Sequence, residues 1–88
     1  MNSVYIKAVL EDNIKPIKIL VLFKHETIMD ACILTCCTHN KLEILEFLLK
    51  YRNPPKYIYD TGLLFAHKHN NLNIVKCLLK NIRTTQQL

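Results

Sequence analysis

The chain has 88 residues, half of them apolar, and 12 Lys and Arg against 7 Asp and Glu give it a net charge of +5. This length predicts one domain, residues 1–88, that is too small to enclose a large catalytic cleft. The apolar fraction excludes an intrinsically disordered chain, and one Gly with three Pro favours helices over a fold with many turns.

Apolar residues recur with the period of a helix and not with the alternation of a strand. Six helices are expected, at residues 3–11, 14–24, 29–39, 42–51, 61–69 and 72–82. Pro16 falls in the first turn of its helix, where the missing N–H costs nothing. The run Asn53-Pro54-Pro55 predicts the end of the fourth helix and an extended linker after it, and residues 84–88 are expected to fray.

One pattern occurs three times, at offsets of 28 and then 30 residues. Small residues align at Ala8, Cys36 and Ala66. Turn residues that tolerate the left-handed conformation align at Asp12, Asn40 and Asn70. Apolar residues align as Ile14/Leu42/Leu72, Ile17/Leu45/Val75, Leu20/Leu48/Leu78 and Val21/Leu49/Leu79. These alignments predict three helix-turn-helix repeats, at roughly residues 3–26, 29–53 and 60–83.

The repeats resemble ankyrin repeats, whose second helix is similar to Asn40–Leu49 and Asn70–Leu79. The resemblance implies an all-α, ankyrin-like solenoid of three short helix-turn-helix repeats. The chain departs from the family at the Thr-Pro-Leu-His start, which is replaced by Ser3–Ile6, Ala31–Leu34 and Thr61–Leu64. The repeats are also shorter than the family's ~33 residues. Either β-hairpins or simple loops can therefore join the units.

Irregular, Asn-, Lys- and Ile-rich repeats of this kind are similar to those of large cytoplasmic DNA viruses, in particular the multigene-family proteins of African swine fever virus. This resemblance implies a non-enzymatic viral protein that acts in the host cell cytoplasm. Its implied function is host–virus interaction, through protein–protein binding to a host protein that modulates innate defence or host range. It implies no cofactor.

In ankyrin-like stacks, ligands dock on the first helices and the loops between units. By register, the outward positions are Lys7/Thr35/Phe65, Leu10/Thr38/Lys68 and Glu11/His39/His69. Tyr, Phe and Arg are typical interface anchors. The predicted partner-binding residues are Lys7, Thr35, His39, Arg52, Tyr57, Tyr59, Phe65, Lys68 and His69. The alternative is that Phe65 packs in the core and that Tyr57 and Tyr59 cover the loop.

The end units carry apolar residues where a solenoid usually has polar ones. These residues are Tyr5, Ile6 and Val9 at one end and Leu79 and Ile82 at the other. We therefore expect a homo-oligomer formed through the end units, or shelter of these residues by further repeats.

A metal site is one alternative, because Cys32, Cys36 and His39 can lie on one side of a helix and suit zinc. Buried, reduced thiols are the preferred interpretation, since Cys36 holds the small-residue position of the repeat. No arrangement of Ser, His and Asp, paired carboxylates or Gly-rich phosphate loop can be assembled, so the sequence predicts no catalytic residues and no metal.

A second alternative is a basic nucleic-acid-binding domain. The positive charge gathers towards the C-terminal end, at Lys68, Lys76, Lys80 and Arg83. We prefer a solvated helix face, because no recognition motif accompanies these residues. The N-terminal residues lack a continuous apolar run of the secretory type, and no apolar stretch approaches the ~20 residues of a membrane span. A cytoplasmic protein without membrane contact is therefore expected.

Overall fold

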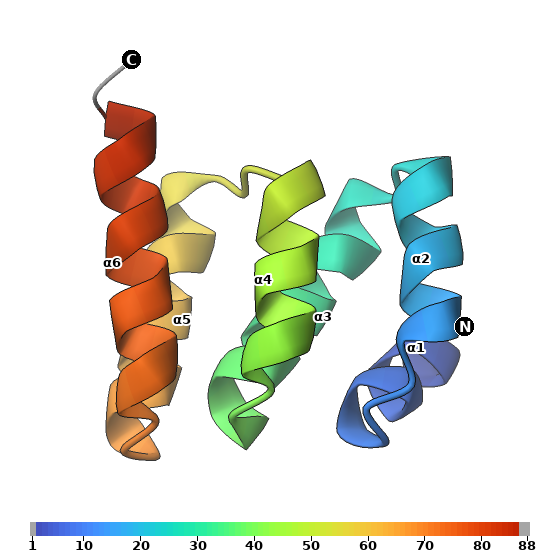
Figure 1. The fold of residues 1–88 in the computed structure, drawn as a ribbon, viewed down its shortest axis with the longest axis horizontal. Helices are drawn as coiled ribbons and strands as arrows, with labels where there is room; N and C mark the ends of the chain where they lie inside the picture. The colour runs from blue at the N-terminus through green and yellow to red at the C-terminus, as the bar shows by residue number, and fades with distance from the viewer. Residues whose placement is uncertain (1, 87–88) are drawn as a thin grey trace.

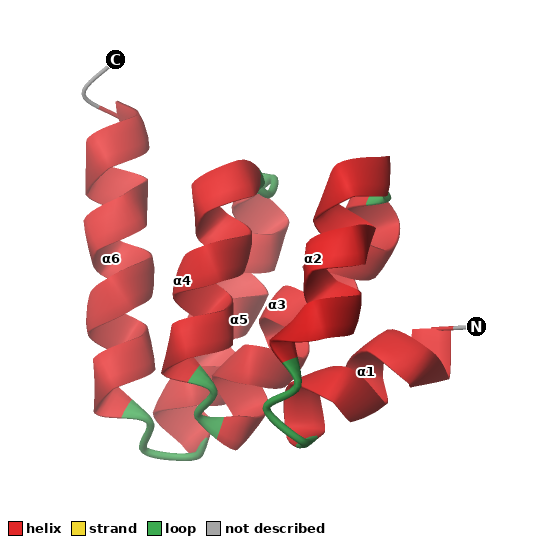
Figure 2. Cartoon of the chain, turned by 45° about the vertical axis from the view of Figure 1, so that its right-hand side comes forward, coloured by secondary structure: helices red, strands yellow, loops and turns green. Residues whose placement is uncertain are grey.

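The computed structural model describes residues 2–86, which form six α-helices joined by short loops (Figure 1). The helices are α1 (Asn2–Leu10), α2 (Ile14–Phe23), α3 (Glu26–His39), α4 (Leu42–Tyr51), α5 (Lys56–Lys68) and α6 (Leu72–Gln86). Within residues 2–86 there is no strand, so the prediction of an all-α chain is confirmed. Simple loops, and not β-hairpins, join the helices of this part of the chain (Figure 2).

The helices alternate between two layers. α2, α4 and α6 form the layer nearer the viewer in Figure 1, and α1, α3 and α5 form the layer behind it. Consecutive helices pack as three hairpins: the first is α1 and α2, the second α3 and α4, and the third α5 and α6. Within each layer every helix contacts its neighbour, α1 with α3 and α3 with α5, α2 with α4 and α4 with α6. The second hairpin is therefore covered on both sides.

The three turns inside the hairpins share one hydrogen-bonded geometry. The predicted turn residues Asp12, Asn40 and Asn70 all take left-handed backbone conformations, with φ of 56°, 58° and 58°. The carbonyl of each aligned small residue accepts a hydrogen bond from the N–H five residues later, and the pairs are Asn13–Ala8 at 2.8 Å, Lys41–Cys36 at 3.0 Å and Asn71–Ala66 at 2.8 Å. This is the Schellman arrangement that closes a helix. The left-handed turns predicted from the repeat are confirmed.

Lys24, which follows α2, is a fourth left-handed residue, with φ of 53°, and the repeat did not predict it. This conformation costs an L-residue such as Lys about 1–2 kcal/mol and costs Gly very little. We expect Lys24→Gly to raise the free energy of unfolding by about 0.5–1 kcal/mol, because part of the gain is offset by the larger backbone entropy of Gly in the unfolded chain. Urea denaturation measures this change.

Asn40→Gly is the matched control for Lys24→Gly, because Asn40 takes the same conformation and Asn tolerates it better than Lys does. Its gain in stability should be the smaller of the two. A loss of stability in Lys24→Gly, with Asn40→Gly unchanged, would contradict the assignment of strain to Lys24.

Two helices begin earlier than the sequence predicted. α3 begins at Glu26 and not at residue 29, and α5 begins at Lys56 and not at residue 61. Pro55 takes φ −65° and ψ 162°, and its carbonyl accepts hydrogen bonds from the N–H groups of Ile58 and Tyr59, so it starts α5 directly. An ion pair of 2.8 Å between Lys56 and Asp60 spans the first turn. The linker after α4 is therefore only residues 52–55 long.

α6 continues through Gln86, into the segment that was expected to fray. The sequence after Ile82 contains neither Gly nor Pro, so nothing in it breaks the helix. Residues 87–88 of that segment lie outside the described residues.

The end units differ from the prediction in one respect: Val9 is fully buried. Val9 belongs to the core, and α1 packs against both α2 and α3. Tyr5, Ile6 and Ile82 are half-buried, and Leu79 is exposed as expected. Besides Leu79, the large apolar side chains exposed on the helices of the two end hairpins are Val4, Leu10, Ile19, Leu22, Phe23, Tyr57, Leu64 and Leu72, which were not predicted as exposed end residues.

Candidate functional site

The predicted partner-binding residues occupy three different environments. Lys7, His39, Tyr57, Lys68 and His69 are exposed. Thr35, Arg52 and Phe65 are half-buried. Tyr59 is buried, with 7% of its surface exposed. The exposed members lie on α1 and α5 and at the C-terminal ends of α3 and α5. Most of the predicted set therefore lies in the layer formed by α1, α3 and α5, the first helix of each hairpin.

Tyr59 is not a surface anchor, which corrects the prediction. Its hydroxyl donates a hydrogen bond of 3.2 Å to Asn53 Oδ1, and it lines the same pocket as Pro54 and Pro55 of the linker. The reason is the early start of α5, which turns an expected loop residue into an inward-facing helical one. Phe65 packs against the core. Tyr57, with 66% of its surface exposed, is the outward-facing aromatic residue among the three.

Thr35 and Thr38 form a strip of small side chains on α3, the middle helix of the layer formed by α1, α3 and α5. Their hydroxyl groups are hydrogen-bonded within α3. The Thr35 hydroxyl donates to the Ala31 carbonyl at 2.9 Å, and the Thr38 hydroxyl donates to the Leu34 carbonyl at 3.1 Å. Longer exposed side chains lie on the two helices that flank α3, with Lys7 and Leu10 on α1 and Tyr57 and Lys68 on α5. We call these six residues the first-helix face: Lys7, Leu10, Thr35, Thr38, Tyr57 and Lys68.

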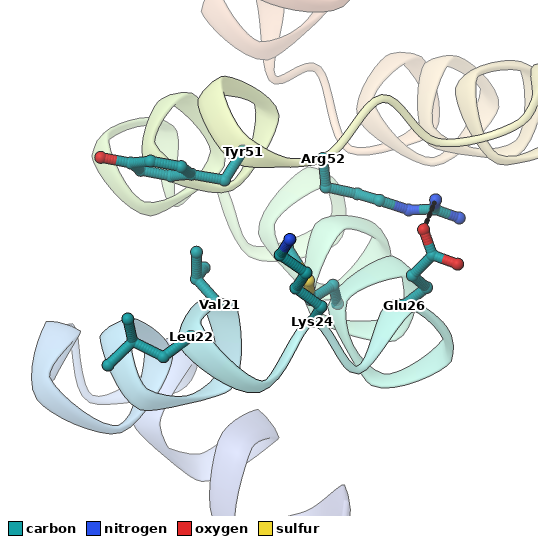
Figure 3. A pocket seen from close by; sticks show the side chains of 7 residues that line it. Val21, Leu22, Lys24, Glu26, Tyr51 and Arg52 are labelled. Carbon is teal, nitrogen blue, oxygen red and sulfur yellow. Dashed lines mark hydrogen bonds and ion pairs between the residues drawn. The ribbon is translucent and has the colours of Figure 1, made fainter.

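Arg52 is held inside the chain by two carboxylates. Its Nε and Nη2 donate to the two oxygens of Asp30 at 3.0 Å and 2.9 Å. Its Nη1 donates to Glu26 Oε2 at 2.7 Å (Figure 3). Asp30 is buried, with 7% of its surface exposed, and Glu26 is exposed. The hydrogen bonds to Asp30 raise the pKa of Arg52 above its ordinary value. Arg52 therefore ties the linker after α4 to α3 and is not available as a partner anchor.

The sequence pointed to Arg52 but not to its partners, which lie 22 and 26 residues away. The sequence did contain one signal that Asp30 has a charged partner. Asp30 interrupts an apolar stretch of α3, between Met29 and Ile33, and a carboxylate in such a position is normally paired.

A pocket of about 410 Å³ lies beside Arg52, between the C-terminal ends of α2 and α4 (Figure 3). Val21 and Leu22 line it from α2, and Tyr51 lines it from α4. Lys24, Glu26, Met29 and Arg52 complete the lining. The pocket is an apolar hollow with a charged rim.

The three cysteines of α3 are buried thiols whose pKa values are raised. Cys32, Cys36 and Cys37 are fully buried, and burial raises the pKa of Cys32 to about 11 and that of Cys37 to about 12. The pKa of Cys36 is also raised, first by burial and then by its neighbour Cys37. A nucleophilic or metal-binding thiol needs the opposite shift. Within the described residues, no group of three or more His, Cys, Asp or Glu side chains could hold a metal ion, and His39 lies exposed while Cys32 and Cys36 lie in the core.

The basic residues of the C-terminal end divide between the two layers. Lys76, Lys80 and Arg83 are exposed and follow one another along a single side of α6, at spacings of four and three residues. Lys68 belongs to α5, in the other layer. None of the helices in residues 2–86 is both long enough and apolar enough to cross a membrane.

Comparison of the chain with protein-family models, curated proteins and solved structures found no match.

Proposed function

We propose that the chain is a non-enzymatic protein-binding module, an ankyrin-like solenoid of three short repeats that holds a partner on its first-helix face. The observation that carries this proposal is the exposure of Lys7 and Leu10 on α1 and of Tyr57 and Lys68 on α5, in the layer formed by α1, α3 and α5. Exposed Tyr with cations and adjoining apolar area is typical of protein interfaces. The two lysines favour a partner with an acidic surface.

The resemblance to ankyrin-like proteins of African swine fever virus extends the proposal to a host protein as partner. The chain would act in the host cytoplasm by occupancy, since a rigid surface can block or hold a regulator of innate defence or host range without making or breaking a bond.

The test is affinity capture from host cytoplasm, followed by calorimetric measurement of the dissociation constant for the captured protein. We expect Tyr57→Ala and Lys68→Glu each to weaken binding at least ~10-fold, because central interface anchors contribute 1.4 kcal/mol or more. Leu22→Ala is the matched control, since Leu22 is 78% exposed but lies on α2 in the other layer. Phe65 is unsuitable as a test residue because it packs against the core. Binding lost in Leu22→Ala and kept in both other variants would refute the choice of face.

The second candidate function is nucleic-acid binding, which the cationic stripe of Lys76, Lys80 and Arg83 on α6 favours. It predicts sub-micromolar affinity for duplex DNA or RNA with a steep negative dependence on salt. A salt titration of Lys76→Glu against the wild type separates the two functions, because that residue lies outside the first-helix face.

A further inference from the structure

Each hairpin presents one side to the hairpin before it, which we call its backward side. It presents another side, its forward side, to the hairpin after it. Gly62 marks the backward side of α5, since a Cβ placed there would lie 3.0 Å from Cys37 Sγ and 3.8 Å from Leu34 Cδ2. Cys37 and Leu34 therefore mark the forward side of α3. The repeat offsets of 28 and 30 residues carry these assignments to the equivalent positions of every hairpin.

At the chain's two ends, the same positions are uncovered. Val4 aligns with Cys32 and Gly62 on the backward side; both of these are buried, whereas Val4 is 59% exposed. On the forward side, Leu64 aligns with the half-buried Leu34 and is 63% exposed. At these positions the first and third hairpins thus expose residues whose equivalents in the second hairpin are covered.

The other layer repeats this pattern. Phe47 lies on the backward side of α4, because it shares a pocket with Ile14 of α2, and its equivalent in the first hairpin is the exposed Ile19. Val21 lies on the forward side of α2, because it shares a pocket with Tyr51 of α4, and its equivalent in the third hairpin is the exposed Leu79. We call Val4 and Ile19 the front flank and Leu64 and Leu79 the rear flank. Figure 1 shows the two hairpins that carry them at opposite ends of the molecule.

A polar contact between the second and third hairpins also has equivalent groups at the two ends of the chain. The Asn71 amide donates to the carbonyls of Cys37 and Thr38 at 2.9 Å and 3.2 Å, which joins the third hairpin to the second. Asn13 occupies the position of Asn71 in the first hairpin and is exposed. The equivalent carbonyls in the third hairpin belong to residues 67 and 68. The first hairpin therefore carries the equivalent of the donor, and the third hairpin the equivalents of the acceptors, of a contact already made between the second and third hairpins.

We propose that each flank is covered by a second copy of this chain, joined head to tail. The front flank of one copy packs on the rear flank of the next, and the Asn13 amide donates to the carbonyls of residues 67 and 68. The occupant is a second copy because the two flanks match in the way that consecutive hairpins match within the chain. The inference rests on the packing between hairpins and not on the proposed host partner.

A head-to-tail contact joins different surfaces and leaves one of each unused at the ends of every assembly, so growth does not stop at a dimer unless a ring closes. Sedimentation velocity over a concentration series should therefore show the wild type growing beyond two chains. The control is Leu22→Lys, which removes an exposed leucine of α2 outside both flanks and should assemble as the wild type does. Units two and three already carry Lys50 and Lys80 at that position.

Two variants block one flank each. Val4→Lys/Ile19→Lys blocks the front flank, and Leu64→Lys/Leu79→Lys blocks the rear flank. All four residues are exposed and Lys is a good helix former, so circular dichroism should show both variants folded. Each variant alone should be monomeric, with association weakened at least ~10-fold. An equimolar mixture should form a dimer of one front-blocked and one rear-blocked chain and nothing larger, because only one matching pair of flanks remains.

Three results would overturn the proposal. A wild type that stays monomeric at every concentration would assign the flanks to further hairpins of a longer chain or to another protein. A single-flank variant that still dimerises alone would show a symmetric contact through one flank. A mixture of the two folded variants that stays monomeric would show that front and rear flanks do not bind each other.

Discussion

Arg52→Ala should lower the free energy of unfolding by about 2–4 kcal/mol, a large share of the stability of a domain of this size. The substitution leaves the Asp30 carboxylate, which is 7% exposed, without the guanidinium that donates to both of its oxygens. Breaking a fully buried pair costs about 3–5 kcal/mol, and the estimate is lowered here because both side chains retain some contact with water. The midpoint of thermal unfolding should fall by about 10–25 °C.

The charge of Arg52 and its forked geometry can be separated by substitution. Arg52→Lys keeps the charge but cannot donate to both Asp30 oxygens in the same plane, so it should lose an intermediate amount of stability. Glu26→Gln is the matched control: Glu26 also bonds to Arg52, at 2.7 Å, but it is exposed, and its loss should change stability by less than about 1 kcal/mol.

A double-mutant cycle with Asp30→Ala completes this test. Because the two residues form one unit, Arg52→Ala in the Asp30→Ala background should cost much less than it does in the wild type. Urea denaturation of the four proteins measures the coupling. Equal costs in both backgrounds would mean that the pair does not anchor the linker to α3.

The regular parts of the fold follow from the sequence because they depend on local pattern. The aligned residues Asp12, Asn40 and Asn70 predicted three left-handed turns, and all three occur. Ile17, Leu45 and Leu78, which the helical period places on one stripe, are buried as predicted. The prediction is wrong for Leu72 and Leu79 of the same stripe, which are exposed, and Ile44 and Ile74 from outside it are buried.

The helix starts were less predictable because they depend on contacts of single residues. Pro-Pro reads as an extended linker, yet Pro55 is also a good residue for the position just before a helix, and α5 begins directly after it. The five residues gained by α5 move Tyr59 from the expected loop into the core. A boundary error of this size thus changed the predicted function of a side chain.

The candidate site was predictable only where exposure follows from the repeat register, as it does for Lys7 and Lys68. The role of Arg52 depends on Asp30, which lies on another helix, and a single sequence gives no measure of that distance. The exposed flanks were partly foreseen from the apolar end units. Val9 was predicted to be exposed at the end of the stack but is buried. The sequence alone does not show which face of α1 packs on the neighbouring helices.

The buried thiols should make the protein unfold in moderately alkaline solution. From an ordinary value near 9, the pKa rises to about 11 for Cys32 and about 12 for Cys37, and it is also raised for Cys36. Above pH 9 the unfolded chain therefore loses thiol protons that the folded chain keeps. Because the folded state binds more protons, its stability falls as pH rises, and this effect is absent below pH 9.

The size of the effect follows from the proton difference. Each retained proton lowers the free energy of unfolding by about 1.4 kcal/mol per pH unit, so three thiols give about 4 kcal/mol per unit until Cys32 begins to ionise in the folded state near pH 11. The loss reaches about 6 kcal/mol by roughly pH 10.5, which is comparable to the whole stability of a small domain. Urea denaturation under reducing conditions, at intervals from pH 8 upwards, measures this slope.

The chain itself supplies the control that isolates the thiols from Lys and Tyr, which titrate in the same range. Ala8 and Ala66 occupy the position of Cys36 in the other two repeats, so Cys36→Ala removes one thiol and leaves a residue that this turn already accepts. The variant should lose stability with a slope about one third shallower than that of the wild type above pH 9. Cys77→Ala should change the slope less, because burial raises the pKa of this half-buried thiol but its side chain is the most accessible of the four. Parallel profiles for the wild type and Cys36→Ala would show that thiol burial does not govern the alkaline limit of the fold.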